Sequence, residues 1–236
     1  MKVNATAIIC AYNEEKTIRN ILKEICDLIL FSEVIIINDG STDDTSNIIL
    51  ELKKTINIRD VHLPKNLGKG FAMAKGVEMA SSEYIVFIDA DLSNYTRNHA
   101  LKLLNPVITG KADMVMGQAT NTLIPPIINP FKKLSGQRAM RRRELLPILE
   151  KMKTVRFGAE TLINMHFKTN NKMVNYVTLH NLVHPTKFHK TKPHIAIKEF
   201  ILEGWQIIAT ASSYFNMNAR LHKNRIHTFL VSTIKS

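Results

Sequence analysis

The chain has 236 residues, of which 45% are hydrophobic and 22% are charged. These proportions are typical of globular proteins, and they exclude intrinsically disordered and fibrous repeat classes. Thirty-two Lys and Arg residues against 20 Asp and Glu residues give a formal net charge of +12. This excess favours an anionic partner, such as a phosphorylated small molecule, an acidic membrane surface or a nucleic acid. Scattered lysines that serve only solubility explain it equally well.

The two cysteines, Cys10 and Cys26, lie in apolar patterns without the spacing of a metal site. We therefore expect buried free thiols in a reducing compartment. No segment approaches the ~20 apolar residues that a membrane-spanning helix needs. The short apolar run at residues 5–11 continues directly into polar residues, unlike a signal peptide. These features predict a cytoplasmic protein.

Short apolar runs alternate with helical patterns in the first half of the chain. Continuous β-branched runs indicate strands that are buried on both faces. In chain order, the pattern predicts a strand at residues 6–10, a helix at 18–29, a strand at 34–37, a helix around 48–52, a weaker strand at 58–63, a helix at 72–79, and strands at 84–88 and 113–116. This alternation predicts an α/β fold with a mostly parallel central sheet and helices on both faces.

The pattern is looser after residue 117. It contains an apolar, loop-like stretch with three prolines and then a basic segment at residues 136–143. Helical spacing predicts helices at residues 145–152 and 157–167, a strand at 174–179, and an amphipathic helix from residue 195 onward. We expect that last helix to pack on the core, with an interfacial helix on acidic lipid as the alternative.

Polar residues follow each of the first four predicted strands. They occupy residues 11–15, 38–41, 66–70 and 89–91. Ligands of an open parallel sheet bind outside the carboxyl ends of the strands, where these four segments would meet. The sequence therefore predicts one binding site at this edge.

Asp89 and Asp91 stand two residues apart, directly after the apolar strand predicted at residues 84–88. Alternate residues of an extended backbone share a face, so both carboxylates can converge on one cation. Their hard oxygen ligands suit Mg²⁺ or Mn²⁺. A solvated turn or a helix N-cap is the alternative interpretation. The apolar strand and the three neighbouring loops favour the metal.

Two further loops carry candidate ligands. Asp39 either forms the turn before Gly40 or accepts a hydrogen bond from a nucleobase. Lys69 lies between Gly68 and Gly70, which permits close backbone approach and supplies a point charge for a phosphate. Neither a Walker A motif nor a GxGxxG motif is present, so dinucleotide-dependent oxidoreductase chemistry is unsupported.

These segments together resemble the family 2 glycosyltransferases, which have the GT-A fold. The resemblance is carried by residues 8–15, 37–43, 66–70 and 88–92. Residues 135–142 add similarity to the dolichol-phosphate mannose synthase and glucosyl-3-phosphoglycerate synthase branches. Ser93 and Gln118 replace a glutamine and an arginine that are usual in the mannose synthase branch, which weakens a polyprenyl-phosphate assignment.

The resemblance implies a nucleotide-diphospho-sugar donor and a single GT-A domain over residues 1–236. Residues 1–117 would form the donor half, and residues 118–236 the acceptor half with a C-terminal helical segment. The donor-binding residues that it implies are Ala11, Tyr12 and Glu14 at the nucleoside, Asp39 at the base, Lys69 at the base or phosphate, Asp89 and Ala90 at the ribose or metal, and Asp91 on the metal.

Candidates in the second half are less specific. Some relatives use a histidine there as a third metal ligand, and we favour His184 over His180, although surface or packed histidines are the commoner case. Glu160 is interpreted either as the base that deprotonates the acceptor or as an acidic residue that stabilises a helix N-terminus. Gly136 and Arg138 are the candidates for binding an anionic acceptor, because a guanidinium pairs bidentately with phosphate or carboxylate.

The resulting hypothesis is an inverting, Mg²⁺- or Mn²⁺-dependent glycosyltransferase, with Glu160 and Asp91 as its catalytic residues. It would move a hexose from a UDP- or GDP-sugar to an unidentified acceptor, either anionic or a lipid phosphate. Peripheral contact with an acidic membrane and a homodimer stay open. No nucleic-acid partner is expected, because aromatic residues are not interleaved with the basic runs. The alternatives are a sugar-1-phosphate nucleotidyltransferase and a non-catalytic basic module that binds membranes or nucleic acid.

Overall fold

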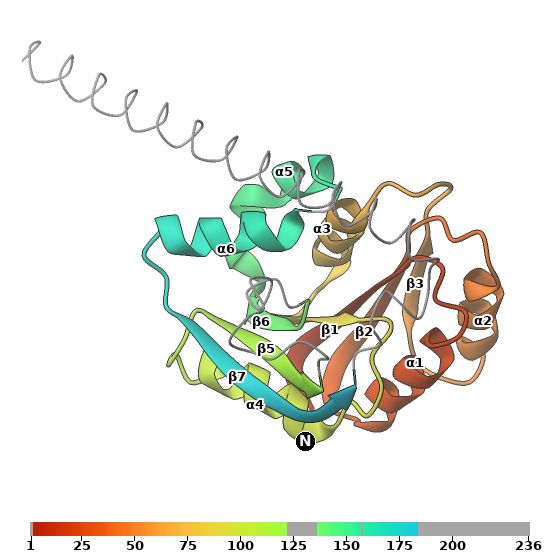
Figure 1. Cartoon of the computed structure of the whole chain (residues 1–236), viewed down its shortest axis with the longest axis horizontal. Coiled ribbons are helices and arrows are strands. Elements are labelled where there is room, and N and C mark those ends of the chain that lie inside the picture. Colours follow the sequence, from red (N-terminus) through yellow and green to blue (C-terminus); the bar gives the residue numbers. More distant parts are fainter. Residues whose placement is uncertain (1, 122–135, 157, 184–236) are drawn as a thin grey trace, which may run out of the picture.

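The computed structural model describes residues 2–121, 136–156 and 158–183 (Figure 1). The described strands are β1 (Val3–Ala11), β2 (Phe31–Asn38), β3 (Arg59–His62), β4 (Tyr84–Asp89), β5 (Met114–Asn121), β6 (Arg138–Arg141) and β7 (Val174–Val183). The described α-helices are α1 (Ile18–Asp27), α2 (Thr45–Leu52), α3 (Lys69–Met79), α4 (Arg97–Ile108), α5 (Leu149–Thr154) and α6 (Ala159–Thr169). Two short 3₁₀ helices, η2 (Arg142–Glu144) and η3 (Leu146–Ile148), precede α5.

The strands form one sheet in the order β3-β2-β1-β4-β6-β5-β7. β1 pairs in parallel with β2 and β4, β2 with β3, and β5 with β7, whereas β6 runs antiparallel to both β4 and β5. Ile8 of β1 lies opposite Ile35 of β2 and Phe87 of β4. The central strands are apolar throughout because both faces of the sheet are covered. The predicted, mostly parallel sheet is confirmed.

Each face of the sheet contributes to a separate apolar core. Ile9 points to the core that includes side chains of α1, α2 and α4, while its neighbour Ile8 points to the core with α3, α5 and α6. Figure 1 shows the same two layers of helices on either side of the strands. Gly76 lets α3 lie close to β1, since a Cβ atom there would be 2.4 Å from the Ile8 side chain. The predicted coverage of both faces is confirmed.

The structure adds two elements that the sequence pattern did not predict. The basic segment at residues 136–143 contains β6, which pairs with β4 on one side and β5 on the other. As an interior strand it is buried at Arg138, Ala139 and Met140. Helix α4 begins with a capping box, in which the Thr96 side chain accepts from the His99 backbone and the His99 side chain accepts from the Thr96 backbone.

Three expectations lie outside the described residues, namely the proline-containing stretch, His184 and the helix from residue 195. Within the described ranges, no helix combines the length and the apolar character that crossing a membrane requires.

Candidate functional site

The loops after β1 and β2 are joined to each other by hydrogen bonds. The Asp39 N–H group donates to the Ala11 carbonyl at 2.8 Å, continuing the β1–β2 pairing by one residue. The Thr42 N–H group donates to the Asn13 side chain at 2.8 Å, and the Glu14 N–H group to the Thr45 hydroxyl at 2.8 Å. These contacts hold the two predicted loops together at the carboxyl edge of the sheet.

The three predicted nucleoside residues of the first loop differ in exposure. Ala11 is buried, whereas the Tyr12 residue is 45% exposed and offers its ring to solvent. The Glu14 carboxylate accepts a hydrogen bond from the Thr17 hydroxyl at 2.9 Å. The exposed ring of Tyr12 could stack on a planar ligand, while Ala11 can contribute only backbone and a methyl group.

Asp39 is buried and holds the loop that leads into α3. Its two carboxylate oxygens accept the N–H groups of Leu67 and Gly68, both at 2.8 Å. Burial raises the pKa of Asp39, and these two hydrogen bonds oppose that effect. Gly40 turns the chain after Asp39 with a φ of +68°, and a Cβ atom there would lie 2.2 Å from the Lys65 carbonyl carbon. Asp39 therefore lies at the predicted turn before Gly40, and its contact with a nucleobase stays a prediction.

Lys69, at the start of α3, bridges two carboxylates. Its Nζ lies 2.9 Å from Asp89 Oδ1 and 2.8 Å from Glu160 Oε1. Burial favours the neutral form of the lysine, but the two carboxylates outweigh this and raise its pKa well above the ordinary value. The pKa of Glu160, by contrast, is lowered. Burial would raise it, but the positive charges of Lys69 and Arg138 more than reverse that effect. Lys69 and Glu160 are therefore both charged at neutral pH.

Asp89, the last residue of β4, is held from two sides. Lys69 contacts Oδ1, and the Gln137 amide donates to Oδ2 at 2.6 Å. A Cβ atom on Gly136 would lie 2.2 Å from Asp89 Oδ1, so the glycine makes room for the carboxylate. A cavity of about 10 Å³ adjoins this cluster, and its lining includes the Cys10 side chain. Cys10 is free, as predicted, but half-buried rather than buried, and desolvation raises the pKa of its thiol.

The residues at the end of β4 are compatible with a divalent cation. Asp91 is half-buried, and Ala90 between the two aspartates is buried. Among the described residues, no group of three or more His, Cys, Asp or Glu side chains is arranged to hold a metal. Mg²⁺ is usually held by one or two carboxylates together with substrate phosphates and water, so the Asp89 and Asp91 pair is chemically sufficient.

The structure places one second-half candidate, Arg138, differently from the prediction. Arg138 was expected to face an anionic acceptor, but it is fully buried, and its Nη1 donates to the Glu160 carbonyl and to Asn164 Oδ1, both at 3.2 Å. Buried in β6, Arg138 holds the first turns of α6, the helix that carries Glu160. His180, in β7, is exposed, and its backbone carbonyl is 2.8 Å from the Nε2 atom of His99; its role as a metal ligand stays a prediction.

Two residues near the site were not singled out from the sequence. Gln137 contacts Asp89, as described above. Arg156 donates from Nη2 to Asn66 Oδ1 at 2.7 Å, and its carbonyl accepts the Gly70 N–H group at 3.2 Å. Gln137 is a neutral residue within a basic run, and Arg156 is one arginine near a loop. Neither has a distinctive spacing, so the sequence alone does not indicate either contact.

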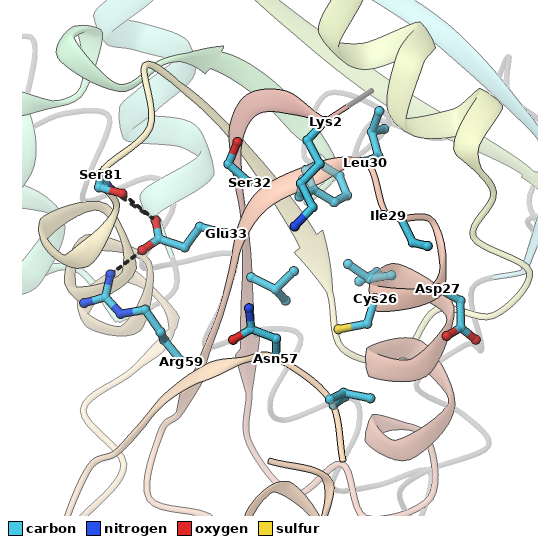
Figure 2. A pocket seen from close by; sticks show the side chains of 14 residues that line it. Lys2, Cys26, Asp27, Ile29, Leu30, Ser32, Glu33, Asn57, Arg59 and Ser81 are labelled. Carbon is cyan, nitrogen blue, oxygen red and sulfur yellow. Dashed lines mark hydrogen bonds and ion pairs between the residues drawn. The ribbon is translucent and has the colours of Figure 1, made fainter. Parts of the chain in front are cut away.

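A hollow of about 740 Å³ lies at the opposite edge of the sheet (Figure 2). Its lining includes Ser32 at the start of β2 and Arg59 at the start of β3, so it faces the amino ends of the strands. The carboxylate of Glu33 there is already paired with Arg59 and accepts from the Ser81 N–H group at 3.1 Å. The charged and polar groups of the four loops converge at the other edge, which is where an open parallel sheet binds its ligands.

Comparison with known proteins gives a family match over most of the chain. The model for glycosyl transferase family 2 matches residues 6–180. A poly-beta-1,6-N-acetyl-D-glucosamine synthase of Staphylococcus epidermidis is 41% identical over 85 residues, which is 36% of this chain and 21% of that protein. The synthase of Staphylococcus aureus strain COL is 38% identical over 87 residues, again 36% and 21% of the two chains. The matched segment thus spans about a fifth of the length of these relatives.

Solved structures share the fold. Glucosyl-3-phosphoglycerate synthase from Mycobacterium tuberculosis, in complex with Mn²⁺, UDP and phosphoglyceric acid, superposes with a TM-score of 0.69 at 24% identity, covering 89% of this chain and 77% of that chain. The same enzyme with Mn²⁺, UDP-glucose and phosphoglyceric acid gives a TM-score of 0.66 at 25% identity, covering 89% and 78%. The seven-stranded sheet described above therefore has the GT-A arrangement.

Proposed function

This chain belongs to glycosyl transferase family 2, and we propose that it transfers a hexose from a UDP- or GDP-sugar to an acceptor, with inversion at the anomeric carbon. One observation carries the proposal. Lys69 of the third loop lies within 3 Å of both Asp89, at the end of β4, and Glu160, at the start of α6. A donor-side carboxylate, a phosphate-binding cation and a candidate base thus share one cluster.

The proposal divides the chain into a donor half, residues 1–117, and an acceptor half, residues 118–236. The exposed ring of Tyr12 and the backbone around Ala11 and Glu14 would contact the nucleoside. Asp39 would approach the base while it holds the loop of Lys69 through Leu67 and Gly68. Lys69 would then place its positive charge near the diphosphate.

Asp89 and Asp91 would hold an Mg²⁺ or Mn²⁺ ion. When bound, the ion supplies positive charge that stabilises the departing nucleoside diphosphate. The solved neighbours contain Mn²⁺ or Mg²⁺ with UDP, which supports the same requirement in this chain. A third protein ligand at His184 is part of the proposal, and that residue lies outside the described part of the chain.

Glu160 is ionised, as a base must be before it accepts a proton, and its lowered pKa makes it a weaker base than an ordinary glutamate. It would accept the proton of an acceptor hydroxyl as the acceptor oxygen bonds to the anomeric carbon from one side and the bond to the diphosphate oxygen breaks on the other. General base catalysis of this kind contributes about 10²–10⁴-fold. An acceptor that is itself a phosphate would need no base, and Glu160 would then only position Lys69.

The acceptor class is proposed to be anionic, either a small phosphorylated molecule or a lipid phosphate. The net charge of +12 favours such a partner and also supports peripheral contact with an acidic membrane. The solved neighbours include complexes with phosphoglyceric acid, a phosphorylated acceptor-sized molecule. The buried position of Arg138 means that another basic group would contact the acceptor anion.

The reaction itself is tested by product analysis. The full chain is incubated with UDP-glucose, UDP-N-acetylglucosamine or GDP-mannose and Mn²⁺, in the presence of phosphorylated acceptors, and the nucleotide products are separated. We expect release of the nucleoside diphosphate. Release of a sugar-1-phosphate on adding pyrophosphate would instead indicate a nucleotidyltransferase. No turnover of any donor, with no nucleotide binding, would contradict the proposal.

A further inference from the structure

We propose that Gln137 is a positioning residue that fixes the orientation of the Asp89 carboxylate for the metal–diphosphate group of the donor. This inference rests on the function proposed above. It adds a residue of the acceptor half, the one directly before β6, to the donor site. Gln137 would contact neither the ion nor the nucleotide, and it would act only through Asp89.

The contact between the two side chains is short and buried. The Gln137 Nε2 atom lies 2.6 Å from Asp89 Oδ2, and Gln137 is 1% exposed. Lys69 occupies the other oxygen of the same carboxylate at 2.9 Å. Lys69 and Gln137, which come from two different parts of the chain, thus hold the two carboxylate oxygens and restrict rotation of the Asp89 carboxylate about the Cβ–Cγ bond. A buried amide that lost this acceptor would incur a desolvation penalty, so the pairing is stable.

The backbone around Gln137 is also fixed. In the antiparallel β4–β6 ladder, Arg138 lies opposite Phe87, so the residues before Arg138 run alongside the end of β4. The Gln137 carbonyl accepts the Gly117 N–H group of β5 at 2.9 Å. Gly136 has no side chain to obstruct Asp89, because a Cβ atom there would lie 2.2 Å from Oδ1. Gln137 therefore reaches Asp89 from the position directly before β6, where the Gly117 hydrogen bond and the β4–β6 pairing that begins at Arg138 hold its backbone in place.

The chemistry of an amide explains why glutamine suits this position. A second lysine or an arginine on Oδ2 would orient Asp89 equally well but would neutralise it. The amide donates a hydrogen bond without a formal charge, so the carboxylate keeps its negative charge for a cation. Lys69 is already shared between Asp89 and Glu160, which leaves the pair of carboxylates with one more negative charge than the lysine supplies.

The inference is tested on the full chain with Gln137→Leu, which removes the donor at similar volume, and Gln137→Asn, whose amide is too short to reach Asp89. Mn²⁺ affinity in the presence of UDP is measured by calorimetry, and the donor and acceptor KM values are measured separately. Asn47→Ala is the matched control, because the Asn47 amide also donates to a carboxylate, Asp44 Oδ1, at 2.7 Å on α2.

We expect both Gln137 variants to fold, and to bind Mn²⁺ about 10–100-fold more weakly with the donor KM raised and the acceptor KM unchanged, as is typical when the partner of a metal ligand is lost. The Asn47 control should match the wild type. Wild-type Mn²⁺ affinity in either folded Gln137 variant would overturn the inference while leaving the proposed function intact. A wild-type protein that binds no nucleotide with Mn²⁺ would overturn the proposed function, and this inference with it.

Discussion

Lys69 Nζ lies 2.8 Å from Glu160 Oε1, so the first residue of α3 is paired with the first turn of α6. The start of α3 is also joined to the connection between α5 and α6 by the Gly70 N–H group, which donates to the Arg156 carbonyl at 3.2 Å. The loop expected to bind the donor and the helix expected to serve the acceptor are therefore one connected unit. A change on either side of this contact should affect both substrates.

Replacing Lys69 by methionine should lower both stability and activity. The substitution leaves Asp89 and Glu160 without their shared cation. Breaking a buried ion pair by removing one partner is strongly destabilising. Because the Lys69 side chain is 34% exposed, we expect a smaller loss of about 2–4 kcal/mol in the free energy of unfolding, measured by urea denaturation.

Lys75→Met is the matched control for this variant. Lys75 lies on the same helix and pairs with Glu78 at 3.5 Å, with its side chain 39% exposed. Its loss should change stability by less than about 1 kcal/mol. Equal effects of the two substitutions would mean that Lys69 makes an ordinary surface pair.

Glu160→Gln should reduce kcat without unfolding the protein. The amide oxygen can still accept a hydrogen bond from Lys69, but glutamine cannot take up a proton from an acceptor hydroxyl. We expect kcat to fall by about 10²–10⁴-fold for a hydroxyl acceptor. Glu150→Gln, at a carboxylate with a side chain 84% exposed, should leave kcat unchanged. A Glu160→Gln enzyme with wild-type kcat would remove the base role.

Alanine substitutions at Gly70 and Gly110 distinguish the steric cost of an added methyl group from its conformational cost. At Gly70 a Cβ atom would lie 1.9 Å from the Val155 carbonyl, whereas at Gly110 nothing lies within 4 Å but φ is +71°. We expect Gly70→Ala to cost about 1–3 kcal/mol through overpacking and to raise the donor KM, because it displaces the Lys69 loop. Gly110→Ala should cost about 1 kcal/mol with an unchanged KM. A normal donor KM in Gly70→Ala would show that the two segments are not coupled.

Glu33 provides a pH-dependent test at the other edge of the sheet. Burial raises its pKa, but hydrogen bonds from Thr6, Ser81 and the Arg59 guanidinium outweigh burial and lower the pKa below the ordinary 4.5. Figure 2 shows the contacts of Glu33 with Ser81 and Arg59. The folded protein therefore holds the proton less tightly than the unfolded chain, so the stabilisation is present above the unfolded pKa and is lost as the pH falls through the folded pKa.

Glu33→Gln should accordingly be less stable than the wild type by about 1.5–3 kcal/mol at pH 7, where these charge-assisted hydrogen bonds are complete. The difference should shrink as the pH drops below 4.5. Unfolding free energies from pH 3 to pH 7 give both curves. A difference that is constant over this range would contradict the assigned pKa direction.

The donor edge could be predicted from the sequence because its elements are local. The strands that end at Ala11, Asn38 and Asp89 are apolar and β-branched, and each is followed at once by polar residues. The carboxyl ends of parallel strands lie at the same edge of the sheet, so their meeting can be predicted without knowing any contact between distant residues. The structure brings Asp39, through Gly68, next to Lys69 and Asp89, in agreement with that expectation.

The second half depends on contacts that no local pattern reveals. Three consecutive arginines after Met140 suggest a solvated face, yet the first of them ends β6, the strand that is inserted between β4 and β5. Arg138 is buried where its Nη1 donates to the Glu160 carbonyl and to Asn164, and both partners come from a helix more than 20 residues later. Burial of a charge depends on such distant partners, so periodicity could not predict β6 or the role of Arg138.

A thermal-shift measurement with UDP and GDP, each with and without Mn²⁺, tests the central claim that the edge formed by the four loops binds a nucleoside diphosphate together with a cation. Asp91→Asn is the test variant, and Asp27→Asn, at an exposed position at the end of α1, is its control. We predict that nucleotide and Mn²⁺ together raise the Tm of the wild type and of the control by about 5–10 °C at about 100 times Kd, and that Asp91→Asn loses this shift. A Tm that responds to neither nucleotide, or that rises equally in Asp91→Asn, would contradict the account.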